Sequence, residues 1–178
     1  MKDLPILLKE LDAVLKQYNP INYSKLLPPL PKKEMDAFLE KLGIDDDDIR
    51  DIFECKNGVD VSDGLDVSED FLDFGVLYPL QAILRSVNLH PDEYSQALPL
   101  ISNAAGDRLL FNNKLGSEYG QFFLESTSNL SLDDEMFSLY DSAYSMIESN
   151  IRFYIEKAFV FDMTEQRLIK DIDKYSRI

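Results

Sequence analysis

Two amphipathic stretches bounded by helix-breaking residues open the chain. In the first, apolar residues recur every three or four positions, at Leu4, Leu7, Leu8, Leu11, Val14 and Leu15. This spacing predicts a helix, which Asn19-Pro20 would end. The second stretch, residues 32–42, follows prolines at 28, 29 and 31 that favour an extended approach to a helix. Gly43 is placed to end this second helix in the left-handed conformation.

A third helix is predicted over residues 44–56, which begin with four consecutive aspartates. Asp45 is expected to cap it, and Asp46 to Asp48 would occupy the first turn, where carboxylates favour the positive end of the helix dipole. Adjacent side chains on a helix point in different directions, so we prefer this interpretation to a metal site. Asn57-Gly58 is expected to stop the helix, because Gly adopts a positive φ readily.

The middle of the chain changes to strand-like patterns. Residues 59–73 are expected to form an acidic loop or ragged strand, and they lack the glycine and glutamate positions of a calcium loop. Residues 74–87 predict a short strand, a turn and a short helix. Three further strands are expected at residues 97–103, 108–114 and 119–127, the first two joined by a tight turn at 104–107. Short connections between consecutive strands favour an antiparallel meander.

The last third of the chain predicts one long helix, from Ser131 to about Phe159. Ser131 and Asp134 form an imperfect capping pair. Apolar and aromatic residues then recur at helical spacing, at Phe137, Tyr140, Tyr144, Ile147, Ile151, Tyr154 and Ala158. Residues 162–178 are expected to form either one more helix or a frayed end. With no internal repeat or long linker, the pattern predicts a single domain over residues 1–178.

Charge is the most informative bulk property of the chain. Lys and Arg number 18 and Asp and Glu number 33, so the formal net charge is −15 at pH 7. Such a surface repels phosphate backbones, which argues against nucleic-acid binding, and it attracts basic proteins. The alternative is that acidity serves solubility alone. The chain shows neither a signal peptide nor an apolar run long enough for a membrane span, so we expect a soluble cytoplasmic protein.

Residues suited to catalysis or to metal binding are few. Cys55 is the single cysteine, which excludes an internal disulfide, and His90 is the single histidine. Nothing in the sequence brings them together, so we expect His90 in a surface loop and Cys55 as a small buried apolar residue. Structural zinc ligands and phosphate-binding loops are absent from the sequence. A hydrolase that uses carboxylates alone stays open as an alternative, but the prediction is a non-enzyme without a cofactor.

The order of several short motifs resembles the SUKH superfamily, which includes fungal cell-wall (glucan synthesis) regulators and bacterial immunity proteins. In that pattern a Glu-containing amphipathic helix precedes Leu-Gly, a second helix and Asn-Gly, and Glu40, Leu42-Gly43 and Asn57-Gly58 match it. Residues 74–83 resemble the short strand and helix of the family. Residues 97–112 resemble its two-strand segment with a Gly-Asp turn.

The resemblance implies an α+β domain, a mostly antiparallel sheet of about four to six strands covered by helices, with no catalysis. It also implies a protein that binds and neutralises a toxin domain. Many such toxins are nucleases with basic surfaces, which a net charge of −15 would complement. The alternative is a regulatory scaffold like the fungal relatives, and the oligomeric state stays open.

The candidate partner-binding surface is the acidic segment between the helical and strand regions. Its acidic residues are Asp60, Asp63, Asp66, Glu69, Asp70 and Asp73. Their density favours contact with a basic protein. The competing interpretation is a solvated loop without a partner.

Overall fold

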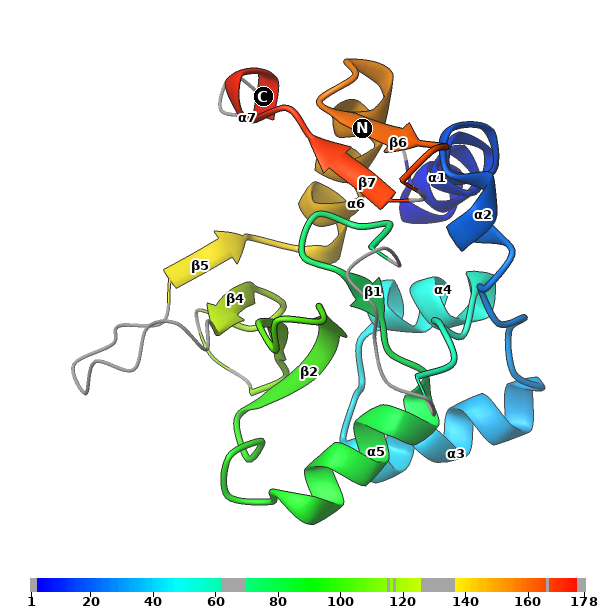
Figure 1. Cartoon of the computed structure of the whole chain (residues 1–178). Helices are drawn as coiled ribbons and strands as arrows, with labels where there is room; N and C mark the ends of the chain where they lie inside the picture. Colours follow the sequence, from blue (N-terminus) through cyan, green and yellow to red (C-terminus); the bar gives the residue numbers. More distant parts are fainter. Residues whose placement is uncertain are drawn as a thin grey trace.

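A five-stranded antiparallel sheet organises the chain, and its strands follow one another in sequence order, β1-β2-β3-β4-β5 (Figure 1). The computed structural model describes residues 3–61, 70–114, 116, 118–125, 137–165 and 167–175. The strands of this sheet are β1 (Val76–Leu77), β2 (Ala97–Ser102), β3 (Arg108–Asn112), β4 (Phe122–Glu125) and β5 (Phe137–Tyr140). A separate hairpin is formed by β6 (Phe159–Asp162) and β7 (Arg167–Lys170).

Helices flank the sheet and confirm the predicted α+β class. They are α1 (Leu4–Tyr18), α2 (Pro20–Tyr23), α3 (Lys32–Leu42), α4 (Asp47–Cys55), α5 (Leu80–Leu89), α6 (Ala143–Ile155) and α7 (Ile172–Tyr175). α1 packs against α4 and α6, and α3 lies beside α5, as Figure 1 shows. The antiparallel meander of β2, β3 and β4 is confirmed as well.

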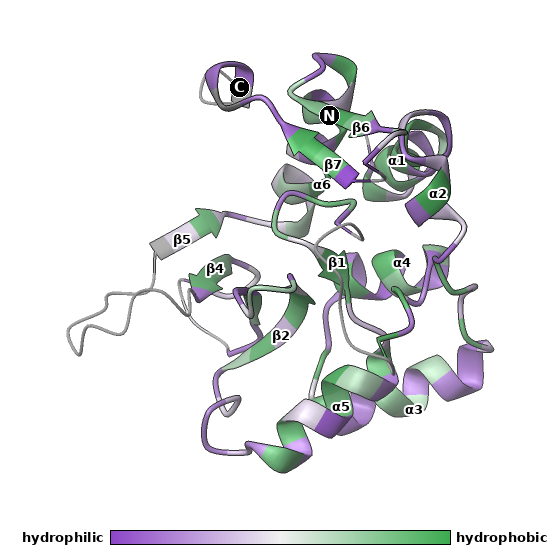
Figure 2. Cartoon of the chain, viewed as in Figure 1, coloured by the Kyte–Doolittle hydropathy of each residue, from purple (hydrophilic) through white to green (hydrophobic). Residues whose placement is uncertain are grey.

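One hydrophobic core joins the helices to a single face of the sheet. The sheet contributes alternate residues: Leu109 and Phe111 of β3 enter this core, whereas Leu110 enters a small cluster with Tyr94 and Ala97 on the other face. Figure 2 shows mostly hydrophobic residues on β1 and β2 and hydrophilic residues at the amino end of α3. Through this alternation, one strand contributes apolar side chains to both faces of the sheet.

The amino-terminal helices end where local signals predicted. α3 spans Lys32–Leu42, and Gly43 follows in the left-handed conformation with φ 67°. For α4 the predicted cap was one residue too early, because Asp46 accepts the backbone N–H of Ile49 at 2.9 Å and Asp45 lies outside the cap. Asp47 and Asp48 occupy the first turn, as expected for carboxylates at a helix amino end.

The predicted long carboxyl-terminal helix is wrong. Its first part is strand β5, which pairs with β4 through Phe122 and Tyr140. α6 begins only after Ser142, whose hydroxyl accepts the backbone N–H of Ser145 at 3.2 Å in a reciprocal capping box. The predicted cap at Ser131 lies outside the described residues. The tail forms the β6–β7 hairpin and α7.

The predicted stop at Asn57-Gly58 lies slightly too late, because α4 ends at Cys55 and its cap, Lys56, is already extended. Asn57-Gly58 instead joins three segments. Gly58 has φ 75°, and its carbonyl accepts the N–H of Leu27 at 2.8 Å. The next residue, Val59, donates its N–H to the carbonyl of Leu77 at 2.9 Å. A Cβ at Gly58 would lie 2.4 Å from the same Leu77 oxygen. The glycine is therefore required by both the backbone conformation and the close approach of β1.

Helices within the described part of the chain are all too short or too polar for a membrane crossing.

Candidate protein-binding surface

The residues of the predicted acidic segment have different environments. Asp60 is exposed, Asp70 is half-buried and Asp73 is buried, with only 3% of its surface accessible. Asp63, Asp66 and Glu69 lie outside the described residues. The described acidic residues of this segment therefore do not form one continuous exposed surface, although Asp60 at its amino end is exposed.

Asp73 is held in a buried polar network. The hydroxyl of Tyr140 donates to its carboxylate at 2.8 Å, and Lys170 lies 3.8 Å from the same carboxylate. The side-chain oxygen of Asn150 accepts the backbone N–H of Asp73 at 2.8 Å. These contacts tie the turn before β1 to β5, α6 and β7. The expectation that Asp73 contributes to an exposed acidic surface does not fit this burial, because its carboxylate is already engaged inside the protein.

Asp70 lies beside this network and is held through its backbone. The side chains of Asn19 and Asn22 donate to its carbonyl at 3.3 and 3.1 Å. Burial raises the pKa of its carboxyl to about 6, the nearby Asp73 adds to this rise, and Lys170 opposes it. Asp70 therefore changes charge in a mildly acidic range in which ordinary aspartates stay ionised.

A groove of about 570 Å³ borders Asp60, and we call it the proline groove. It is built by three segments distant in the chain: the extended residues before α3, the link after α4, and the first turns of α5. Its lining residues are Leu27, Pro28, Pro29, Leu30, Pro31, Asn57, Asp60, Val61, Pro79, Gln81, Ala82 and Arg85. Most of them are apolar, although several, including Pro28 and Pro29, are exposed.

The sequence creates this groove through its prolines. Pro28, Pro29 and Pro31 restrict their own backbone and that of their neighbours to extended conformations, so this segment does not fold back as a helix. It is anchored at one end, where the carbonyl of Leu27 accepts the N–H of Asn57 at 3.1 Å. At the other end, Pro31 precedes the first residue of α3. A stiff wall therefore stands opposite α5.

The polar groups of the groove lie on the side of α5. Asn57 uses both ends of its amide: its oxygen accepts from Leu80 at 3.2 Å and its nitrogen donates to the side-chain oxygen of Gln81 at 3.1 Å. The remaining polar end of Gln81 is its NH₂ group. Arg85, one turn further along α5, is exposed and makes no ion pair with the described residues. This side of the groove thus offers hydrogen-bond donors.

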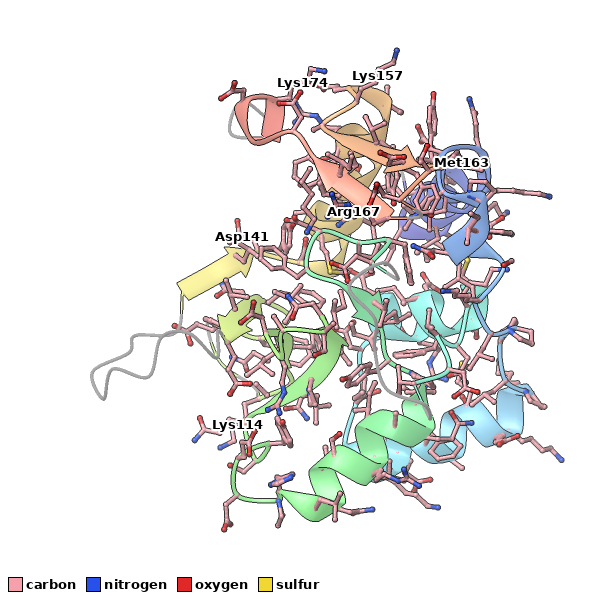
Figure 3. All side chains as sticks on the ribbon, viewed as in Figure 1. Lys114, Asp141, Lys157, Met163, Arg167 and Lys174 are labelled. Atoms are coloured by element: carbon pink, nitrogen blue, oxygen red, sulfur yellow. The ribbon has the colours of Figure 1, made fainter. Side chains whose placement is uncertain are left out.

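A second hollow, of about 200 Å³, lies between the amino end of α4 and the turn from β5 to α6. Asp46 and Asp48 line it together with Asp141, which Figure 3 shows at the end of β5. We call these three residues with Asp47 and Asp51 the α4 acidic cluster. Burial raises the pKa of Asp48, and the neighbouring carboxylates raise it further. The described lining residues of this hollow include no Lys or Arg.

The same carboxylates affect a tyrosine beside the hollow. Burial and the nearby Asp46 raise the pKa of Tyr119 to about 12, and its hydroxyl donates to the carbonyl of Asp45 at 3.1 Å. Among the described residues, no group of three or more His, Cys, Asp or Glu side chains has the geometry to hold a metal ion. The cluster is therefore best described as a concentration of negative charge.

Cys55 and His90 lie in separate environments. Cys55, half-buried, lines a small apolar cavity of about 50 Å³, and burial raises the pKa of its thiol. His90 is exposed at the end of α5, with Glu93 at 3.7 Å. No hydrogen bond joins the side chain of Cys55 to that of His90. A raised thiol pKa disfavours the thiolate that nucleophilic catalysis needs.

No protein-family model matches this chain, and no curated protein sequence matches it either. The resemblance to the SUKH superfamily therefore stays a prediction from the order of its motifs.

Sequence reasoning missed the proline groove. The prolines at 28, 29 and 31 were a usable signal, but they were interpreted as a connector to α3. Nothing local indicated that α5 would face them, because α5 lies some fifty residues further along the chain.

Proposed function

We propose that this chain is a non-catalytic protein-binding domain of the immunity type, which binds and neutralises a basic toxin domain in the cytoplasm. The observation that supports this proposal best is the proline groove. It combines an exposed apolar wall with charged residues at its margins, Asp60 and Arg85. Protein interfaces have the same composition, an apolar centre inside a polar rim.

The chemistry of the groove favours binding over catalysis. Its described lining residues include no Ser, Thr, Cys, His, Tyr or Lys, so among them the usual nucleophiles and the commonest general base are lacking. Its amides and Arg85 are suited to orienting a ligand through hydrogen bonds.

The charge distribution supports a basic partner. The net charge is −15, and the α4 acidic cluster concentrates part of it around a hollow without a lining cation. Opposite charge speeds diffusional encounter and steers orientation, so a basic toxin domain would associate quickly at low salt. The proposed role agrees with the role implied by the SUKH resemblance.

The proposal is tested with the purified chain and the toxin domain encoded by the neighbouring gene. We expect a stoichiometric complex, loss of toxin activity and association that slows as salt increases. Replacing Ala82 by Arg fills the groove and adds a positive charge, and should weaken binding at least tenfold. Asn88→Arg, an exposed change on the same helix outside the groove lining, is the matched control. Circular dichroism verifies that both variants are folded.

A second pair of variants tests the role of charge. Asp47→Asn with Asp51→Asn should slow association about tenfold at low salt and flatten its salt dependence. The control removes two exposed acidic residues outside the α4 acidic cluster, Asp92→Asn with Glu148→Gln. Binding without loss of toxin activity would favour the regulatory-scaffold alternative. The absence of any complex would reject the immunity role.

A further inference from the structure

The two sides of the proline groove differ in the chemistry they offer to a ligand. One side is the extended segment from Leu27 to Pro31, with apolar side chains. Three of its residues are prolines, which have no backbone N–H. This side therefore favours aliphatic groups and offers few hydrogen-bond donors to a ligand.

The opposite side, on α5, offers donors. Gln81 and Arg85 both line the groove and are four residues apart, so they lie on the same face of the helix. The oxygen of Gln81 already accepts a hydrogen bond from Asn57, which leaves its NH₂ group for a ligand. Arg85 carries a guanidinium group without an ion-pair partner among the described residues. Ala82 lies between them, and its small side chain lets a ligand approach this face of α5 closely.

We infer that the proline groove binds an extended segment of a protein partner in which one Asp or Glu side chain lies among aliphatic residues. The carboxylate meets the guanidinium of Arg85 and the NH₂ of Gln81, since a guanidinium pairs favourably with a carboxylate in a bidentate geometry. The aliphatic neighbours cover Pro29 and Leu30. Asp60 is the one carboxylate among the described lining residues, and it opposes a second acidic residue in the ligand.

A side-chain carboxylate fits this groove better than a chain-terminal one. Capture of a terminal carboxylate relies on several converging backbone N–H groups. The proline side lacks them at 28, 29 and 31, and on α5 the N–H groups of Ala82 and Ile83 are bonded to the carbonyl of Pro79. Among the described lining residues, the side chains of Gln81 and Arg85 are the remaining side-chain donors.

The inference deepens the proposed function, because it assumes that the occupant of the groove is a protein. It adds the chemistry of the segment that enters the groove: mostly aliphatic, with one carboxylate, even where the partner as a whole is basic. The test therefore uses peptides and no toxin, so the inference about the groove can fail while the proposed function stands, and the reverse.

The test titrates the ¹⁵N-labelled full chain with three blocked hexapeptides, Ser-Leu-Val-X-Leu-Ser, in which X is Glu, Gln or Lys. Backbone amide shifts identify the site, and their saturation measures affinity. We expect the Glu peptide to shift the amides of Gln81, Ala82 and Arg85 and to bind about tenfold more tightly than the Gln peptide. The Lys peptide should bind more weakly still, because it faces Arg85.

Arg85→Gln isolates the proposed ion pair. This variant should bind the Glu and Gln peptides equally, while keeping the weak aliphatic contribution to both. Arg152→Gln, another exposed arginine on a helix, should preserve the tenfold preference of the original chain. Equal affinity of the original chain for all three peptides, or shifts confined to residues outside the groove, would overturn the inference. So would a preference for Glu that survives Arg85→Gln.

Discussion

The side-chain oxygen of Asn57 accepts the backbone N–H of Leu80 at 3.2 Å, so a residue that follows α4 caps the amino end of α5. The residue at the cap position itself is Pro79, which provides no side-chain hydrogen bond. The first N–H groups of a helix need partners from outside the helix. Asn57 supplies one, and its buried amide also fixes Gln81, which lines the proline groove.

We predict that Asn57→Ala lowers the free energy of unfolding by about 1–3 kcal/mol, because it removes the cap and leaves a buried N–H without a partner. Urea denaturation followed by circular dichroism measures the change. Gln81→Ala removes only the second hydrogen bond at an exposed position, and should cost less than about 1 kcal/mol. Equal losses for the two variants would contradict the capping role of Asn57.

Gly58 and Gly43 provide a matched comparison of two left-handed glycines. Their φ angles are 75° and 67°. A Cβ at Gly58 would meet the carbonyl oxygen of Leu77 at 2.4 Å, whereas at Gly43 no atom lies within 4 Å. Gly43→Ala should cost about 1–2 kcal/mol from the backbone conformation alone. Gly58→Ala should cost clearly more, because β1 must also move away.

Thermal denaturation of the two glycine variants measures this difference. A similar fall in melting temperature for both would mean that the contact between Gly58 and Leu77 relaxes without cost. A larger fall for Gly58→Ala would also explain why Asn-Gly, and not Asn alone, follows α4.

Asp73 and Asp60 belong to the same acidic segment but should respond differently to neutralisation. Asp73→Asn removes the buried charge that faces the partly exposed Lys170, and it alters the acceptor of the buried Tyr140. We expect a loss of about 2–4 kcal/mol, as for a broken buried pair. Asp60→Asn, at an exposed position, should change stability by less than about 0.5 kcal/mol.

Asp73→Asn should therefore lower stability, whereas Asp60→Asn should leave stability almost unchanged. Chemical denaturation measures stability, and titration with the basic partner measures binding. Asp60→Asn should affect only binding. A stable Asp73→Asn variant with weakened binding would show instead that Asp73 acts at the surface.

The predictions that held were those carried by local chemistry. Gly43 indicated the end of α3, because a left-handed residue after an amphipathic run is a local signal. The turn with Gly106-Asp107 likewise joins β2 to β3. The antiparallel meander of β2, β3 and β4 follows from short connections between strand-like runs.

The predictions that did not hold depended on distant partners. Tyr140 and Tyr144 continue a helical spacing, yet Tyr140 pairs with Phe122 in the sheet. Asp73 sits in an acidic run that looks exposed, but its partner Lys170 lies 97 residues away. The proline groove likewise needs three separate segments. No window of local sequence contains these relationships.

Asp70 predicts a specific pH dependence. Its carboxyl has a pKa of about 6 in the folded protein, because burial disfavours the charged form, against about 3.8 for an ordinary aspartate. The folded state therefore holds an extra proton between about pH 4 and pH 6. The stabilising contribution of that proton is complete below pH 4 and is lost as the pH rises through 6.

Asp70→Asn should remove this dependence. At pH 7 the variant should be more stable than the original chain by about 1–2 kcal/mol, allowing for partial solvent screening. At pH 4 the two proteins should match, since both carry a neutral side chain there. Urea denaturation across this range measures the difference. A difference that stays constant with pH would mean that Asp70 titrates normally.

Lys157 is the one residue other than glycine with a positive φ in the described part of the chain, at 58°. It directly follows the cap of α6, Glu156, at a position where glycine is preferred. Figure 3 shows its side chain pointing away from the rest of the molecule.

Lys157→Gly should raise the free energy of unfolding by about 0.5–1 kcal/mol, because the left-handed conformation costs a lysine more than a glycine. Lys157→Ala removes the charge but keeps the Cβ, so it should give no such gain in urea denaturation. An equal gain for both variants would contradict this explanation, since loss of a positive charge should not stabilise a chain whose acidic residues outnumber its basic ones.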